Sequence, residues 1–261
     1  MDLTNRIALA AIEAGKEILH VYENEFSVAY KSDQSPLTLA DQKAHDVISY
    51  YLKQTPYPIL SEEGRDVPFE KRANWPCYWL VDPLDGTKEF VKRNGEFTVN
   101  IALIKEGIPV LGVVYAPVKQ WLYIGESGEG AWKLELKEHQ FPDNWKEAGE
   151  RLPSKAEEDR KYTVVGSRTH ASEETKEFIA KLQEAHGDIA FVSMGSSLKL
   201  CLVAEGVADI YPRMAPTMEW DTAAGDAIVS SAGYRVVQYE NDAPLQYNKE
   251  NLLNPWFVVK R

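Results

Sequence analysis

The stretch Tyr78-Trp79-Leu80-Val81-Asp82-Pro83-Leu84-Asp85-Gly86-Thr87 leads from an apolar run into two carboxylates, a glycine and a hydroxyl. Because proline has no amide hydrogen to donate, we expect the strand to stop at Pro83 and the chain to turn there. Asp82 and Asp85 then converge on one point, where their hard oxygen ligands suit Mg²⁺. Gly86 lets the backbone approach an anion, and the amides after it can bind phosphate if a helix begins there. The stretch therefore predicts a turn that holds a divalent metal against a phosphate.

Asp-Pro and Asp-Gly pairs are also ordinary turn formers, so this stretch alone leaves a purely structural turn open. Two further segments carry acids where an element ends or begins. Glu62 and Glu63 follow the predicted strand end Ile59-Leu60, and Asp221 follows Glu219-Trp220 at the start of a predicted helix. Acids brought this close repel one another, and Mg²⁺ ions between them would relieve the repulsion, with Asp82 central enough to bridge a pair.

Each acid outside the first stretch also has a structural explanation. Asp221 can cap a helix over 222–231, and Glu62 or Glu63 can be an exposed loop acid. Asp41 follows Thr38 by three positions, a spacing close to that of a capping box at a helix start. Spacing alone does not rank these acids.

The composition of the chain limits its partners and its location. The 261 residues carry a net charge of -11, which argues against a polymeric nucleic acid partner, because binding to a phosphate backbone needs a basic surface. The start Met1-Asp2-Leu3-Thr4 lacks the features of a signal peptide, and no apolar run approaches the roughly 18 residues of a membrane span. We therefore expect a cytoplasmic protein without an integral membrane segment. Cys77 and Cys201 lie in apolar surroundings and are predicted to be buried free thiols.

Apolar periodicity predicts alternating helices and strands. Residues 7–22 and 39–54 repeat apolar side chains every three or four positions, as in amphipathic helices, and 57–60 is a short strand. Segments at 97–104, 110–115 and 121–125 predict an antiparallel meander. Further along, we expect strands at 162–165, 189–192, 208–211 and 235–239, and helices at 172–185, 198–204 and 222–231. This alternation is typical of a layered α/β fold.

Residues 133–160 are rich in Lys, Glu, Asp and Pro and show little periodicity, so we predict that they form a connecting excursion. We place a domain boundary within 150–160. The predicted organisation is an α+β domain over 1–155, which carries Asp82 and Asp85, and an α/β domain over 156–261, which carries Asp221.

Three segments of the chain resemble the signature segments of the inositol monophosphatase superfamily of Mg²⁺-dependent, lithium-sensitive phosphomonoesterases. Their order and separations also match, and the segments are Leu60-Ser61-Glu62-Glu63, Trp79-Leu80-Val81-Asp82-Pro83-Leu84-Asp85-Gly86-Thr87 and Trp220-Asp221-Thr222-Ala223-Ala224-Gly225. Within the superfamily, residues 89–100 and 195–206 are most similar to the CysQ-type 3'(2'),5'-bisphosphate nucleotidases. The resemblance covers essentially the whole chain. It implies an αβαβα sandwich with an antiparallel amino-terminal sheet, a mixed carboxyl-terminal sheet, and helices between and outside them.

The resemblance also implies a set of metal ligands. Glu62, Asp82 and the carbonyl of Leu84 would bind one Mg²⁺, and Asp82, Asp85 and Asp221 would bind a second. A weaker third ion would use Glu62 and water. The resemblance thus implies two to three ions in all.

Catalytic roles follow from the same resemblance. Thr87, hydrogen-bonded toward Asp41, would position the attacking water together with Glu62. The amides of Gly86 and Thr87 would bind the phosphate that is removed. The implied reaction is direct in-line attack by metal-activated hydroxide without a phosphoenzyme intermediate.

The choice of substrate depends on cations away from the metals, because an adenosine bisphosphate brings a second phosphate dianion. Lys199 lies near the start of a predicted helix behind Ser196, and the fork of Arg213 suits bidentate phosphate binding. The resemblance implies that Ser196, Lys199 and Arg213 contact the 5'-phosphate and that His170 lies near the nucleotide, as do Glu62, Leu84, Asp85 and Asp221. Taken singly, Lys199 and Arg213 can be surface charges and His170 can cap a helix.

The expected reaction is hydrolysis of the 3'-phosphate of 3'-phosphoadenosine 5'-phosphate to AMP and phosphate. Inositol monophosphatase or sugar bisphosphatase activity is the nearest alternative, and an inositol monophosphate would leave Lys199 and Arg213 without a substrate partner. A non-catalytic metal and phosphate sensor is a second alternative. Superfamily members are often homodimers, and some are thought to touch the inner membrane peripherally, although no basic amphipathic helix supports such contact here.

Overall fold

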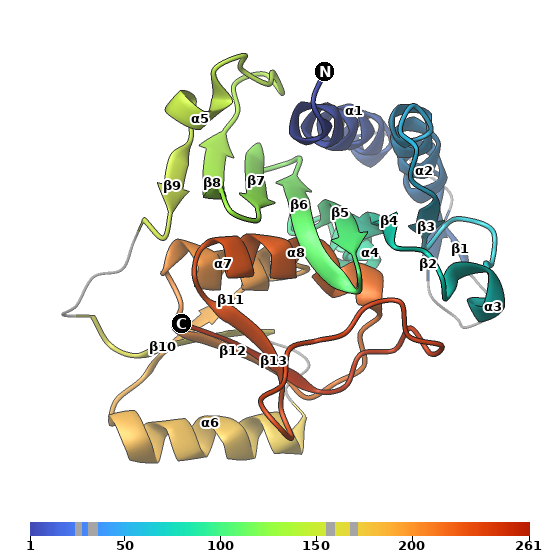
Figure 1. Cartoon of the computed structure of the whole chain (residues 1–261). Helices are drawn as coiled ribbons and strands as arrows, with labels where there is room; N and C mark the ends of the chain where they lie inside the picture. Colours follow the sequence, from blue (N-terminus) through green and yellow to red (C-terminus); the bar gives the residue numbers. More distant parts are fainter. Residues whose placement is uncertain (24–27, 31–35, 155–159, 168–171) are drawn as a thin grey trace.

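The computed structural model describes residues 1–23, 28–30, 36–154, 160–167 and 172–261. Helices and sheets alternate in layers from α1 and α2 at the top of Figure 1 to α6 at the bottom. The outer helices are α1 (Leu3–Glu23), α2 (Leu39–Leu52) and α6 (Glu173–His186), and α7 (Leu198–Glu205) and α8 (Glu219–Ser231) lie between the two large sheets. The predicted αβαβα sandwich is confirmed.

The larger sheet has seven strands in the order β3-β4-β5-β6-β7-β8-β9. All neighbours are antiparallel except β3 and β4, which are parallel, so this sheet is not purely antiparallel as expected. The strands are β3 (Ile59–Ser61), β4 (Cys77–Asp85), β5 (Thr98–Lys105), β6 (Ile108–Ala116), β7 (Trp121–Glu126), β8 (Gly130–Glu135) and β9 (Glu150–Leu152). The predicted meander is confirmed as β5-β6-β7 and continues beyond it on both sides.

The second sheet has five strands in the order β11-β10-β12-β14-β13, and it is mixed as predicted. Its strands are β10 (Thr163–Gly166), β11 (Ala190–Ser193), β12 (Ile210–Arg213), β13 (Arg235–Gln238) and β14 (Phe257–Lys260). Strand β14, which apolar periodicity does not predict, inserts between β12 and β13. A further two-stranded antiparallel sheet pairs β1 (Val28–Tyr30) with β2 (Pro36–Thr38).

The expectation that the strand beginning near Tyr78 stops at Pro83 is wrong. Strand β4 runs on to Asp85, and its pairing with β5 passes from Asp82 opposite Asn100 to Asp85 opposite Thr98. Three steps along β4 therefore face two steps along β5, which is a β-bulge. The bulge accommodates the missing amide of Pro83. It also breaks the regular alternation of side chains between the two faces of the sheet at Asp82 and Asp85.

The connecting excursion predicted for 133–160 is also wrong over much of its length. Strands β8 and β9 extend the larger sheet, with the short helix α5 (Trp145–Ala148) between them. The rings of Trp132 and Trp145 pack edge to face at 5.3 Å, so the aromatic side chains supply a core that the charged composition concealed. A strand of three residues such as β9 is too short for periodicity to reveal.

Helix α8 packs closely against the larger sheet because two strand glycines remove the side chains in its way. A Cβ atom at Gly112 would lie 2.5 Å from the carbonyl oxygen of Ala224, and one at Gly125 would lie 2.5 Å from the Cα atom of Ile228. Buried residues from β4 to β7, α7 and α8 form one hydrophobic cluster. The division into domains at 1–155 and 156–261 stays a prediction.

Both cysteines are predicted to be buried free thiols. Cys201 is buried and Cys77 is half-buried, and both thiols are free. Across the described residues, no helix combines the length and apolarity needed to cross a membrane. The side chain of Thr38, which we considered as a cap for α2, lies outside the described part of the chain.

Candidate metal and phosphate site

Asp82 is the centre of the acidic group that the sequence predicts. Its side chain is 1% exposed, and its Oδ1 accepts a hydrogen bond from the amide of Leu84 over 3.1 Å. Burial raises the pKa of Asp82 well above its usual range, and nearby carboxylates add to the effect. In order of decreasing influence, these are Glu62, Asp85, Asp221 and Asp41. The fold therefore brings all five predicted acids into one neighbourhood.

Asp85 lies at the end of β4 and joins the two halves of the chain. Its Oδ2 accepts hydrogen bonds from the amide of Ser197, at 2.6 Å, and from the hydroxyl of Ser196. The hydroxyl of Ser196 also approaches the carbonyl of Asp85 at 3.3 Å. These contacts hold the start of α7 against the acidic group.

Asp221 lies in the first turn of α8, because the helix begins at Glu219, three residues before the predicted start at 222. Its carboxylate accepts a hydrogen bond from the amide of Met218 over 2.9 Å, so Asp221 completes a capping box from the third helical position, while Met218 and not Asp221 is the cap at the helix start. Burial, followed by the charge of Asp85, raises the pKa of Asp221 to about 8. Capping and membership of the acidic group therefore coexist in this one side chain.

Glu62, Asp41 and Thr87 approach the acidic group from three other elements. Glu62 is exposed just after β3, where its amide donates to the carbonyl of Val81 at 3.1 Å. Asp41 is 2% exposed in the first turn of α2. The hydroxyl of Thr87 lies 3.5 Å from the carbonyl of Leu84, while its predicted hydrogen bond to Asp41 stays a prediction.

Gly86 separates the acids from the short helix α4 (Thr87–Val91). Its φ of 89° is in the left-handed region that favours glycine, and a Cβ atom there would lie 3.3 Å from the Cβ atom of Ser196. Gly86 therefore lets the chain turn sharply between Asp85 and Thr87 while the loop at 195–197 lies close by.

The donor set of this group fits Mg²⁺. The carboxylates and the Leu84 carbonyl are all hard oxygen donors, and Asp82 is a buried carboxyl group surrounded by like charges, whose repulsion a bound cation would offset. Within the described ranges, no group of three or more His, Cys, Asp or Glu side chains is arranged as a metal site. Mg²⁺ usually keeps several waters and binds substrate phosphates, so it needs few protein ligands.

A cleft of about 180 Å³ begins at these acids and continues to Lys199 and Arg213. Asp85, Gly86 and Asp221 line one part of it, and Lys199 and Arg213 line another. Lys199 is only 7% exposed, and its ammonium donates to the carbonyl of Ser196 over 2.6 Å. Burial lowers the pKa of Lys199 to about 8, against the opposing influence of Asp85.

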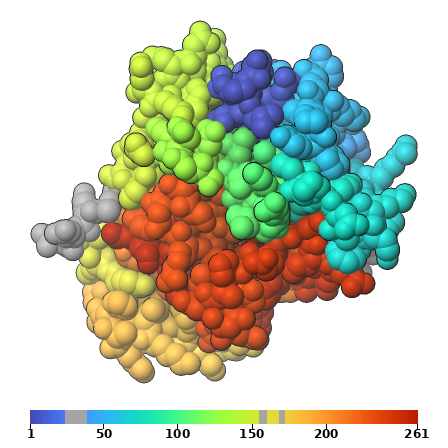
Figure 2. Space-filling view, viewed as in Figure 1, coloured from blue at the N-terminus to red at the C-terminus, as the bar shows by residue number. Residues whose placement is uncertain are grey.

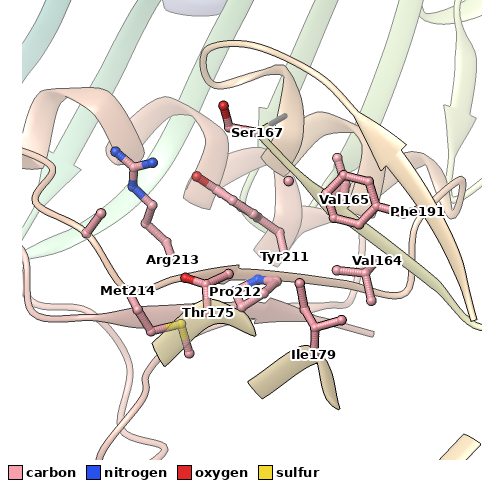
Figure 3. A pocket seen from close by; sticks show the side chains of 12 residues that line it. Val164, Val165, Ser167, Thr175, Ile179, Phe191, Tyr211, Pro212, Arg213 and Met214 are labelled. Atoms are coloured by element: carbon pink, nitrogen blue, oxygen red, sulfur yellow. The ribbon is translucent and has the colours of Figure 1, made fainter. Parts of the chain in front are cut away.

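Arg213 ends strand β12 and contributes the second cation of the cleft. Figure 3 shows its side chain and that of Tyr211 on one side of the strand, with Thr175 and Ile179 of α6 on the other. One guanidinium nitrogen of Arg213 donates to the carbonyl of Pro216 at 3.1 Å. The Nε atom is buried and has no hydrogen-bond partner among the described residues.

His170 lies outside the described residues, so its predicted place near the nucleotide stays a prediction. Three polar residues that the sequence analysis left without roles help to build the site. Glu96 accepts the amide of Gly195 over 2.8 Å, and Thr98 and Asn100 lie 2.8 Å from the hydroxyl of Ser197. Thr98 and Asn100 share one face of β5, whose other residues up to Ile104 are apolar, a pattern from which their buried roles could have been inferred.

Comparison with known proteins places this arrangement in a family. The model of the inositol monophosphatase family matches residues 2–256. The 3'(2'),5'-bisphosphate nucleotidase CysQ of Escherichia coli strain K12 is 47% identical over 98% of this chain and 99% of its own length. The corresponding CysQ of Salmonella typhimurium is 46% identical over 98% and 99% of the two chains.

A solved structure gives the same relationship. CysQ from Bacteroides thetaiotaomicron, described as a bacterial member of the inositol monophosphatase family, superposes with a TM-score of 0.88 and 50% sequence identity. The match covers 98% of this chain and 96% of that one. Phosphatases of this family are generally Mg²⁺-dependent, in agreement with the oxygen donors around Asp82. This chain belongs to the inositol monophosphatase family.

Proposed function

We propose that the chain is a 3'(2'),5'-bisphosphate nucleotidase that removes the 3'-phosphate of 3'-phosphoadenosine 5'-phosphate. The observation that carries the proposal is the cleft that joins Asp85 and Asp221 to the cations Lys199 and Arg213. The acidic end suits metal and the phosphate to be removed, and the cationic end suits a second phosphate. Inositol monophosphate has no second phosphate for these cations to bind.

The relatives support the same substrate class. Those from Escherichia coli and Salmonella typhimurium carry the name 3'(2'),5'-bisphosphate nucleotidase and match this chain over nearly its full length. A small nucleotide as substrate also agrees with the net charge of -11, which disfavours a polymeric nucleic acid. The homodimer and the cytoplasmic location stay predictions.

We assign the metal ligands as the sequence predicts. Glu62, Asp82 and the Leu84 carbonyl would hold one Mg²⁺, and Asp82, Asp85 and Asp221 would hold a second, with Glu62 contributing to a third. When bound, the ions supply positive charge that makes a water molecule more acidic and stabilises the leaving oxygen. The high pKa of Asp82 in the absence of such charge supports this assignment.

The remaining roles belong to groups of the chain itself. The amides of Gly86 and Thr87, at the turn into α4, would bind the phosphate to be removed, and Thr87 with Asp41 and Glu62 would orient the attacking water. The 5'-phosphate would lie against Lys199, Arg213 and Ser196. Its binding there fixes the orientation of the 3'-phosphate at the opposite end of the cleft.

The test compares phosphate release from 3'-phosphoadenosine 5'-phosphate, inositol 1-phosphate and fructose 1,6-bisphosphate, each with and without Mg²⁺. We expect Mg²⁺-dependent release with the highest kcat/KM on the nucleotide. An equal or higher kcat/KM on inositol phosphate or the sugar bisphosphate would refute the nucleotidase assignment. No Mg²⁺-dependent release from any of the three would favour a non-catalytic sensor.

A further inference from the structure

The first residue of α8 carries a buried charge that the proposed reaction does not use. Glu219 is 0% exposed and lies two positions before Asp221. Its carboxylate accepts the amides of Asn248, at 2.7 Å, and Lys249, at 3.0 Å, and pairs with the Lys249 ammonium at 2.5 Å. The first turn of α8 is therefore fastened to the segment 248–250.

The same segment is held from the other side by Arg72, which ends the short helix α3 (Phe69–Arg72). Arg72 is 3% exposed, and its guanidinium donates to the side chain of Asn248 at 2.9 Å and to the carbonyls of Lys249 and Glu250 at 2.7 and 2.9 Å. The side chain of Asn248 donates back to the carbonyl of Arg72 over 2.7 Å. In Figure 2 the teal surface at the right of the molecule lies directly against the red surface of the carboxyl-terminal part of the chain.

Arg72 also reaches back toward the loop that carries Glu62. Its Nε donates to the carbonyl of Val67 at 3.3 Å, and Val67 lies in the loop that follows Glu62. A continuous set of contacts therefore runs from that loop through Arg72 and the segment 248–250 to Glu219. The two ends of this path are the segments that bear Glu62 and Asp221, acids contributed by distant parts of the chain.

We propose that Arg72, Glu219 and the segment 248–250 form a clamp that sets the separation of Glu62 from Asp221 and thereby positions these acids for Mg²⁺. The clamp rests on the proposed function in that it takes both acids as metal ligands. Arg72 and Glu219 are positioning residues, since neither belongs to the proposed metal ligands or substrate contacts. Both are buried, and each holds the segment 248–250 through several hydrogen bonds, so loss of either weakens the attachment of that segment.

The test measures Mg²⁺ binding by isothermal titration calorimetry with no substrate present, on the wild type and on Arg72→Met and Glu219→Gln. Groups that orient metal ligands typically affect metal affinity about 10- to 100-fold, and we expect a Kd for Mg²⁺ weakened by that factor. At saturating Mg²⁺, we expect kcat and the KM for the nucleotide to return to within about twofold of the wild type, because the acids themselves remain. An unchanged Kd for Mg²⁺ in both variants would overturn the clamp.

Asn248→Gly is a milder variant that remains informative if the buried substitutions prevent folding. Asn248 has a φ of 70°, which glycine adopts without strain, so the change removes only the side-chain contacts with Arg72. We expect a folded protein with a Kd for Mg²⁺ weakened several-fold. Wild-type affinity in this variant would count against the proposal.

Lys133→Met is the matched control for general loss of stability. Lys133 forms a buried ion pair with Glu205 at 2.9 Å, and Glu205 ends α7 far along the helix from Ser197. We expect a lower melting temperature with an unchanged Kd for Mg²⁺. If Lys133→Met weakens Mg²⁺ binding as much as Glu219→Gln does, the effect is nonspecific and the clamp is refuted. The clamp and the proposed function can also fail separately. If the clamp variants weaken Mg²⁺ binding but the wild type has no nucleotidase activity, the proposed function is refuted and the clamp is not.

Discussion

Lys199→Met isolates the contribution of one buried charge to substrate choice. Methionine keeps the length and the apolar stem of the side chain and removes the ammonium, which now donates to the Ser196 carbonyl at 2.6 Å. A hydrogen bond to a charged group contributes about 1.5 to 3 kcal/mol, and about 1.4 kcal/mol corresponds to a tenfold change. We therefore expect kcat/KM for 3'-phosphoadenosine 5'-phosphate to fall about 10- to 100-fold, mainly through KM.

The assay compares that substrate with adenosine 3'-monophosphate, which lacks the second phosphate. We expect kcat/KM for the monophosphate to change less than about threefold, since its contacts lie at the acidic end of the cleft. Lys88→Met is the control, because Lys88 lines the same cleft but is exposed to solvent, where a charge is screened. An equal loss on both substrates in Lys199→Met would show that Lys199 supports the structure, and the reasoning would fail.

The pH profile gives an independent check on the same residue. Burial lowers the pKa of Lys199 to about 8, so the free enzyme carries the charge below that pH and loses it above. In the wild type, kcat/KM for the bisphosphate should fall as the pH rises through about 8, because kcat/KM reports ionisation of the free enzyme. Lys199→Met should lack this fall. Identical profiles for the two proteins would contradict the assignment of the charge to phosphate binding.

Three further predictions concern other parts of the structure. Asp82→Asn should abolish turnover at any Mg²⁺ concentration, and retained activity at saturating Mg²⁺ would contradict the bridging role. The same variant should raise the melting temperature of the metal-free protein at pH 7, because it removes a buried carboxylate that its neighbours repel. Gly125→Ala should lower the free energy of unfolding, measured with urea, by about 1 to 3 kcal/mol or more, because the new methyl group would lie 2.5 Å from the Cα atom of Ile228. A decrease below about 0.5 kcal/mol would mean that α8 moves away from the sheet freely and would contradict the close packing. Burial raises the pKa of Asp226 to about 6, so its ionisation destabilises the fold as the pH rises from about 4 to 6, by about 3 kcal/mol in total. In Asp226→Asn this loss should be absent from unfolding curves measured at pH 4 and pH 7, and equal pH dependence in the two proteins would refute the assignment to Asp226.

The sequence predicts best those features that depend on neighbouring residues. The order of the helices and strands follows from apolar periodicity, and the acids of the site stand out because they interrupt apolar runs. Pro83 shows the limit of such local rules. Its missing amide does end regular pairing, but the partner strand β5 continues and takes the extra residue into a bulge between Asp82 and Asp85. Whether the chain turns or bulges there depends on the partner strand, which the local stretch does not contain.

Other features depend on contacts between residues far apart in the sequence. In the sequence, Arg72 and Glu219 cannot be told from ordinary charged residues. In the structure, both contact the segment 248–250, which is more than 170 residues from Arg72 along the chain. Strand β9 has three residues and only one buried side chain, so it gains its identity from pairing with β8. Thr98 and Asn100 are an intermediate case. Their spacing on one face of a mainly apolar strand can be read from the sequence, but their contact with Ser197 cannot.

The contacts of Asp85 link metal binding to substrate choice. Its carboxylate belongs to the acidic group around Asp82, yet it also accepts the amide of Ser197 and the hydroxyl of Ser196, and Ser196 in turn accepts the ammonium of Lys199. A cation bound at Asp85 Oδ2 would draw on the same oxygen that holds this loop, so metal binding there would affect the position of Lys199. The two ends of the cleft would then not be independent. Comparisons of Lys199 variants on different substrates measure the phosphate contact alone only when Mg²⁺ is saturating for every variant.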